Sequence, residues 1–186
     1  WGYAHVAQAW TGGSLTHTNA LGGGGSLWFI DTPMATLLVP VTWAFGPIAS
    51  YNLSIFINLS LAGYASWGLA RHLSGSSSAA LFTGVVCALS PYLLSQVHSG
   101  ISESLGVGCF ALSTWAWVLW REQGSWQKAA LAGLALGAAV LSSWYTGLFA
   151  LLLVPAAVWG MGRSHLRTLP LALALFLAVT LPTLIA

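Results

Sequence analysis

Long apolar runs separated by short polar breaks dominate the chain. A helix needs about 20 residues to cross the hydrocarbon core of a bilayer, so run length and helix breakers decide which segments span it. Run length together with the positions of the breakers gives about six candidate spans. They cover residues 49–72, 77–97, 99–120, 128–142, 147–162 and the run that starts near residue 169. We therefore predict an all-α, polytopic integral membrane protein with about six transmembrane helices.

Prolines modify two parts of this pattern. Pro91 lies inside the second run and predicts a kink or break there. The segment 33–47 is apolar but contains three prolines and offers only about 15 helical residues, which is too short for a span. We expect this segment to form a re-entrant or interfacial helix.

The basic residues give the predicted bundle an orientation. All five lysines and arginines lie in three polar breaks. When successive runs alternate in direction, these breaks fall on one face, which the positive-inside rule assigns to the cytoplasm. The opposite face then receives residues 1–48, the corner at 91–98 and the turn at 142–147. The basic residues are Arg71, Arg121, Lys128, Arg163 and Arg167.

The N-terminal part differs from the rest. Residues 1–10 form a predicted amphipathic helix with a tryptophan at each end, and residues 11–31 form a glycine-rich loop. This loop could order around a ligand or serve only as a connector. We divide the chain into an external region, 1–48, and a transmembrane bundle, 49–186. Because the bundle stops within an apolar run, we expect the sequence to be a piece of a longer protein.

Composition supports the membrane assignment. With 57% hydrophobic and 4% charged residues, the chain has too little polar surface for a water-soluble protein and no basic surface for nucleic acid. The two cysteines, Cys87 and Cys109, lie in apolar runs, and we expect them to be small buried residues. Gly133 and Gly137 form a GxxxG pattern that indicates close helix packing, either within the bundle or in a dimer.

Of the three carboxylates, Glu103 is the most informative. It lies about one turn inside the third run, where an ionised carboxylate is costly unless it is paired or faces a polar cavity. Two interpretations stay open: a structural hydrogen bond to a neighbouring helix, or a site residue facing an external cavity beside His98. Glu122 adjoins Arg121 and is most simply a solvated surface charge.

Asp31 is the only aspartate and closes the glycine-rich loop. The sequence Asp-Thr-Pro is typical of a helix N-cap followed by an early proline. The alternative is a carboxylate at the membrane surface that serves as a base or a metal ligand, placed at headgroup depth by Trp28 and Phe29.

Two stretches carry a resemblance to a known family. They are the stretch from Ala62 to Tyr92, which includes LARHLSGS and ALSPY, and the SSWYTG turn at 142–147. The order of elements along the chain is also similar to that of the family. Over roughly residues 45–155, the chain resembles the multi-pass bacterial glycosyltransferases of the GT-C superfamily.

The resemblance implies an inner-membrane enzyme that moves a sugar from a polyprenyl-phosphate carrier to an acceptor on the periplasmic side. A carboxylate of the first external loop would act as general base or as ligand of a divalent metal. We expect the principal aspartate of that family upstream of Trp1. In this chain the resemblance makes Asp31 and Glu103 the catalytic candidates, with substrate-binding roles for His98, Trp144 and Tyr145.

This function leaves one feature unexplained. A lipid phosphate requires cations, and the predicted external face carries no lysine or arginine, only His5, His17 and His98. The competing interpretation is a non-catalytic membrane scaffold or accessory subunit of a larger complex. A transporter is disfavoured, because a single intramembrane carboxylate provides few groups for an ion pathway and because the sequence shows no inverted repeat.

Overall fold

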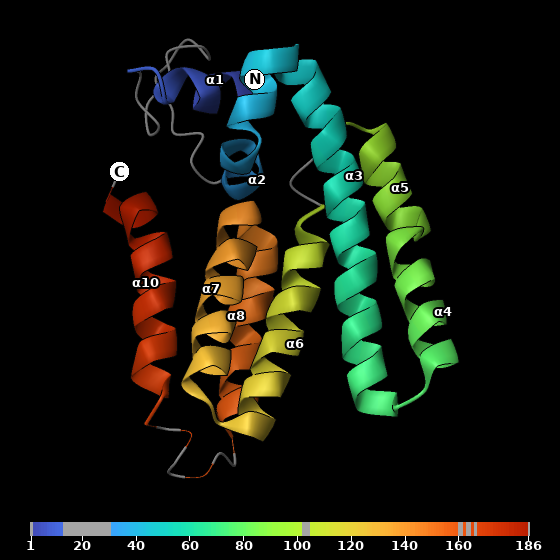
Figure 1. Ribbon diagram of the computed structural model, residues 1–186, viewed down its shortest axis with the longest axis vertical. Coiled ribbons are helices and arrows are strands. Elements are labelled where there is room, and N and C mark those ends of the chain that lie inside the picture. Colours follow the sequence, from blue (N-terminus) through green and yellow to red (C-terminus); the bar gives the residue numbers. More distant parts are fainter. Residues whose placement is uncertain are drawn as a thin grey trace.

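The computed structural model describes residues 2–12, 31–101, 105–159, 162, 165 and 167–185. This part of the chain is all helical, as predicted (Figure 1). The helices are α1 (Gly2–Ala9), α2 (Thr32–Leu37), α3 (Val39–Ser74), α4 (Ser77–Ala88), α5 (Pro91–His98), α6 (Val107–Gln123), α7 (Trp126–Ser142), α8 (Trp144–Val158) and α10 (Leu169–Ile185).

Two stretches of the described chain are long and apolar enough to cross a membrane, Val39–Ser74 and Ser77–His98. Shorter apolar helices cover Tyr145–Pro155 and Leu169–Leu181. The helices α6 and α7 have 17 residues each, slightly below the usual length of a span. The number of about six transmembrane helices therefore stays a prediction, as does the division at residue 48.

The break expected at Pro91 is present. Helix α4 ends at Ala88, and α5 starts at Pro91. Ser90 is the N-cap of α5, and its hydroxyl accepts a hydrogen bond from the Leu93 backbone N–H at 3.3 Å. Proline at the first helical position supplies the required φ and lacks only an N–H that would have no partner there.

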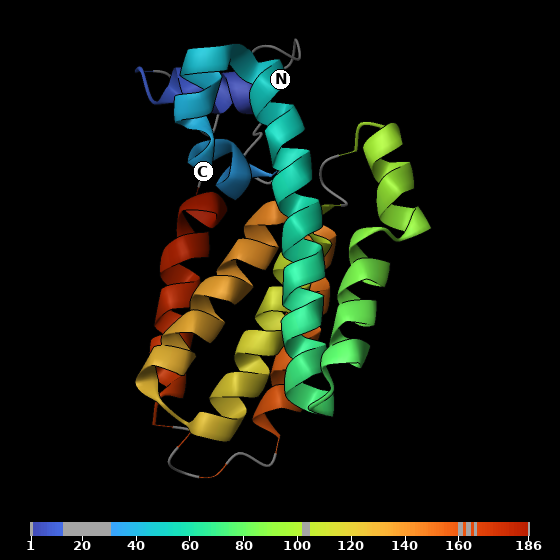
Figure 2. The ribbon, with the colours of Figure 1, turned by 45° about the vertical axis from the view of Figure 1, so that its right-hand side comes forward.

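The segment 33–47 is helical, but it does not form one separate helix. It is divided between α2 and the first part of α3, and the backbone of α3 leaves helical geometry at Gly46, where φ is +84°. Glycine tolerates this positive φ, and Pro47 follows it. The hydroxyls of Thr42 and Ser50 lie 2.7 Å apart across the kink. The chain thus rises through α2, turns at the kink and descends along the rest of α3 (Figure 2).

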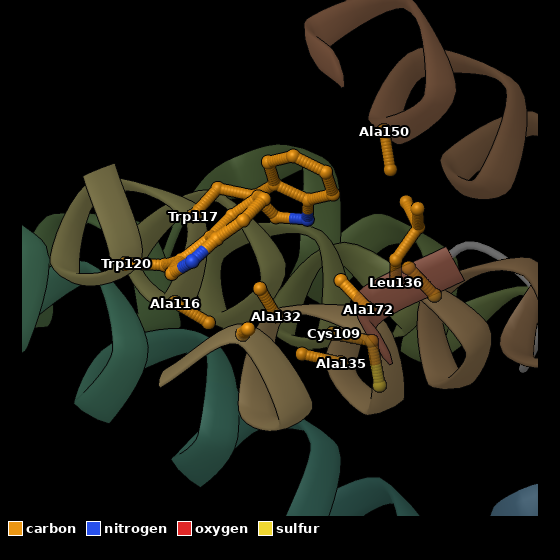
Figure 3. Close-up of a cluster of buried hydrophobic side chains, with 11 residues drawn as sticks. Cys109, Ala116, Trp117, Trp120, Ala132, Ala135, Leu136, Ala150 and Ala172 are labelled. Atoms are coloured by element: carbon orange, nitrogen blue, oxygen red, sulfur yellow. The ribbon is translucent and has the colours of Figure 1, made fainter. Parts of the chain in front are cut away.

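Small residues bring the helices of the bundle close together. A Cβ added at Gly133 would lie 2.2 Å from the carbonyl oxygen of Ala172 in α10, and one at Gly137 would lie 2.9 Å from Val179. The GxxxG face therefore packs inside the bundle. The main hydrophobic cluster joins α6, α7, α8 and α10 around two large side chains, Trp117 and Trp120 (Figure 3).

Contacts hold together the turns that carry the basic residues. The His72 ring nitrogen lies 2.7 Å from Glu122 Oε2, which links α3 to α6. Trp120 Nε1 donates to Thr168 Oγ1 at 2.9 Å, which links α6 to the segment before α10. Glu122 is thus an exposed but paired charge. These turns lie at one end of the bundle, while α1 and α2 lie at the other (Figure 1).

Candidate active site

Asp31 lies where the N-terminal helices meet the bundle. It directly precedes α2, which sits above α7 (Figure 1). Its side chain is only 4% exposed, and its backbone adopts a left-handed conformation with φ 51°. Aspartate tolerates this conformation better than most residues, but it remains uncommon outside glycine. A buried carboxylate on an uncommon backbone conformation marks this position as a candidate site.

The N-cap interpretation of Asp31 is wrong for its side chain. Asp31 occupies the N-cap position of α2, yet its carboxylate makes no capping hydrogen bond. Instead, the Tyr3 hydroxyl donates to Asp31 Oδ2 at 2.6 Å. The aspartate therefore uses its carboxylate to hold α1 rather than to start α2.

Tyr3 is the site residue that sequence reasoning missed. Its hydroxyl also interacts with the Ser54 hydroxyl, and its ring packs edge-on against Tyr51 at a centroid distance of 6.0 Å. Both of these residues belong to α3. A signal was present, because Tyr3 lies in a predicted amphipathic helix and a buried tyrosine needs a partner for its hydroxyl. Local sequence does not show that this partner is Asp31.

Burial changes the proton affinity of both groups. Removal of the carboxylate from water raises the pKa of Asp31 to about 7, and the hydrogen bond from Tyr3 offsets this effect in part. Burial, reinforced by the neighbouring Asp31 charge, raises the pKa of Tyr3 well above its ordinary range. Tyr3 therefore stays a hydrogen-bond donor at neutral pH, while Asp31 can exchange a proton there.

A cavity of about 440 Å³ adjoins Tyr3, and Asp31 lies behind this tyrosine rather than in the cavity wall. Tyr3 forms part of its wall, with residues from the kink of α3 and the segment after α5. The other lining residues are Pro47, Ile48, Tyr51 and Gly100. The cavity therefore offers a small polar molecule a place beside the tyrosine that holds Asp31.

A second, larger groove of about 720 Å³ runs between α5, α6 and α8. Tyr145, predicted to bind substrate, lies in its wall and is 70% exposed. Aromatic and aliphatic side chains make up most of the surface. The other lining residues are Tyr92, Val107, Phe110, Ser143, Thr146, Phe149, Leu152 and Leu153. This composition suits an apolar chain with a polar group at one end.

The corner between α7 and α8 supports this groove. Ser142 and Thr146 are buried, and both hydroxyls donate to the carbonyl oxygen of Ala139 at 3.0 Å. These bonds add to the backbone hydrogen bond that the same carbonyl accepts from the Ser143 N–H at 3.3 Å. The hydroxyls of the SSWYTG turn thus fix the corner from which Tyr145 projects.

The structure gives less information on the other predicted site residues. His98 is the last residue of α5 and is exposed, and no hydrogen bond or ion pair joins it to Asp31 in the described structure. Trp144 begins α8 through its backbone, but its side chain lies outside the described residues, as do Glu103 and His17. The structure brings Asp31 and Tyr145 to the same end of the bundle, where Tyr145 lines the 720 Å³ groove and Asp31 bonds to Tyr3 in the wall of the 440 Å³ cavity.

The donors around Asp31 do not assemble a metal site by themselves. Among the residues that the structure describes, no three His, Cys, Asp or Glu side chains come together. Asp31 accepts a hydrogen bond from the Tyr3 hydroxyl, which is a donor and so occupies one carboxylate oxygen with a proton rather than a cation. The divalent metal that the resemblance implies therefore stays a prediction, and no residues are assigned to it.

Comparison with known proteins gives a family. The searches of curated proteins and of solved structures return no match. A family described as dolichyl-phosphate-mannose-protein mannosyltransferase matches residues 32–185. This match covers α2 to α10 and starts one residue after Asp31. The chain belongs to this family of membrane glycosyltransferases of the GT-C type.

Proposed function

We propose that the protein transfers a sugar from a polyprenyl-phosphate carrier to an acceptor hydroxyl on the periplasmic side of a bacterial inner membrane. The observation that carries this proposal is the buried Tyr3–Asp31 pair beside a cavity, at the end of the bundle that also holds the apolar groove. The family supplies the reaction class, and these features supply a base and a place for a lipid.

Asp31 acts as the general base in this proposal. The acceptor hydroxyl occupies the cavity beside Tyr3 and gives its proton to the carboxylate of Asp31. The hydroxyl oxygen then attacks the anomeric carbon, the bond from that carbon to the phosphate oxygen breaks, and polyprenyl phosphate leaves with the bonding electrons. A carboxylate with a pKa near the working pH is a better base than one at its ordinary value.

Tyr3 is a positioning residue. Its hydroxyl engages Oδ2 of Asp31 at 2.6 Å and so fixes the orientation of the carboxylate, which leaves Oδ1 as the oxygen that meets the acceptor. Glu103, which follows Gly100 of the cavity wall by three positions, is proposed as the second acidic residue of the site. His98 is proposed to bind the substrate, with a ring N–H as a hydrogen-bond donor to the phosphate.

The groove between α6 and α8 receives the prenyl chain. Phe110, Phe149 and Leu152 supply apolar surface, and Tyr145 stands at 70% exposure beside them, where its ring can stack against the sugar or the first isoprene unit. Trp144 is proposed to contact the same part of the donor.

The test is turnover of the intact protein with a polyprenyl-phosphate sugar. Asp31→Asn keeps an acceptor for the Tyr3 hydroxyl but removes the base, so we expect kcat to fall about 100-fold or more. Glu103→Gln is measured in parallel. Glu122→Gln is the matched control, because it removes a carboxylate at the other end of the bundle. Unchanged turnover in both Asp31→Asn and Glu103→Gln would remove these residues from the mechanism.

A further inference from the structure

A small pocket extends from the middle of the bundle to Arg121, near the end of the bundle opposite to Asp31. It has a volume of about 200 Å³ and lies between α6 and α8. The α6 residues that line it recur at spacings of one, four, five and eight positions, which places them on one face of that helix. The lining residues are Ser113, Thr114, Trp117, Val118, Arg121, Ala150 and Leu153.

The charge of this pocket is positive. Arg121 is the charged residue among those that line it, and it lies in the last turn of α6. The neighbouring acid, Glu122, contacts His72 of α3 at 2.7 Å and is therefore directed away from α8. The Arg121 guanidinium thus stands above an apolar pocket with no carboxylate in the pocket wall.

A buried donor without a partner also belongs to this pocket. Trp117 is 5% exposed, and its indole Nε1 is buried with no hydrogen-bond partner among the residues that the structure describes. The adjacent Trp120 packs edge-on against it at 5.1 Å, yet Trp120 Nε1 donates to Thr168. An indole N–H buried without an acceptor is costly, so Trp117 indicates a missing acceptor. Figure 3 shows the Trp117 ring extending from α6 on the side of Ala150, which lines the same pocket.

A ligand that satisfies these groups needs three parts. It needs an anionic group for Arg121, an oxygen that accepts from Trp117 Nε1, and an apolar chain for Val118, Ala150 and Leu153. A phospholipid has a phosphate, ester carbonyls and acyl chains in this order. Basic pockets between membrane helices bind such headgroups, and a zwitterionic headgroup would bring an ammonium toward the arginine.

We propose that the pocket between α6 and α8 binds an anionic phospholipid, with its phosphate on Arg121 and an ester oxygen on Trp117. The acyl chain follows Val118 and Leu153 toward the middle of the bundle. The phosphate end of this site, at Arg121, lies among the turns that carry the basic residues and so differs from the proposed transfer site, whereas the acyl-chain end meets the 720 Å³ groove at Leu153, which lines both. This site holds a structural lipid rather than a substrate.

The test is thermal unfolding of the intact protein in detergent micelles that contain increasing mole fractions of lipid. Phosphatidylglycerol should raise the melting temperature at a lower mole fraction than phosphatidylcholine does. Arg121→Gln should increase the half-saturating fraction of phosphatidylglycerol about fivefold. Trp117→Phe keeps an aromatic ring but removes the N–H, and it should increase that fraction about threefold.

Two controls identify the source of the anion and the place of binding. Inorganic phosphate should give no comparable shift, and an equal shift would overturn the lipid assignment. Lys128→Gln removes a positive charge at the start of α7, at the same end of the bundle but outside the pocket. It should leave the phosphatidylglycerol titration unchanged. A loss in Lys128→Gln equal to that in Arg121→Gln would overturn the pocket as the site.

Discussion

The hydroxyl of Tyr3 donates a 2.6 Å hydrogen bond to Oδ2 of Asp31, and both residues are buried. The two residues are 28 positions apart in the sequence, and this bond fastens α1 to the start of α2. It also lowers the pKa of Asp31, which burial raises.

Replacement of Tyr3 by phenylalanine should move the pH dependence of sugar transfer. The Tyr3 hydrogen bond lowers the pKa of Asp31, which burial raises to about 7. Without this bond the pKa of Asp31 rises further, so the acidic limb of kcat/KM shifts to higher pH. The measurement is a pH profile of kcat/KM for wild type and Tyr3→Phe.

Tyr51→Phe is the control for this shift. Tyr51 packs against Tyr3 and lines the same cavity, but its hydroxyl does not hold Asp31. Its acidic limb should match that of the wild type. If Tyr3→Phe lowers kcat/KM equally at every pH, then Tyr3 acts only on packing and the positioning role is wrong.

The raised pKa of Asp31 also predicts a pH dependence of stability. The carboxyl titrates at about 7 in the folded protein and near 3.8 when unfolded. A raised pKa stabilises the fold below the unfolded value, and this contribution is lost as pH rises through about 7. Asp31→Asn cannot ionise, so its melting temperature should exceed that of the wild type at pH 8 and approach it at pH 4. A difference that is the same at both pH values would contradict the buried, protonated carboxyl.

The sequence predicts the helices well because their signals are local. The break at Pro91, the helix over 49–72 and the close packing of Gly133 all follow from residue type and spacing. The kink in segment 33–47 is harder to predict, because it depends on a positive φ at Gly46. Glycine permits this conformation without requiring it.

The candidate site is harder to predict from sequence than the helices are, because its contacts join residues that are far apart in the sequence. Asp-Thr-Pro fits an N-cap equally well, and only the approach of α1 brings Tyr3 to Asp31. The groove beside Tyr145 depends in the same way on the packing of α6 against α8 and on the approach of Tyr92 from α5. Local patterns single out Asp31 as a candidate but do not identify what surrounds it.

Gly133→Ala tests the close packing of α7 and α10. The added Cβ would lie 2.2 Å from the carbonyl oxygen of Ala172, so one backbone must move. Overpacking of this kind costs about 1–3 kcal/mol, and we expect a lower melting temperature. Gly2→Ala is the control, because nothing lies within 4 Å of its added Cβ. A Gly133→Ala protein as stable as Gly2→Ala would show that α10 does not pack against this face.

Two adjacent leucines of α8 separate donor binding from general effects of a polar residue in the membrane. Leu152 lines the 720 Å³ groove, whereas Leu151 does not, and both are exposed. If the prenyl chain lies in the groove, Leu152→Gln removes apolar contact with it and should raise KM for a long-chain polyprenyl-phosphate sugar about tenfold. Leu151→Gln should leave this KM unchanged. A donor with a single isoprene unit should reduce the difference between the two variants, because less of its chain reaches the groove. Equal KM values for Leu152→Gln and Leu151→Gln with the long donor would place the prenyl chain elsewhere.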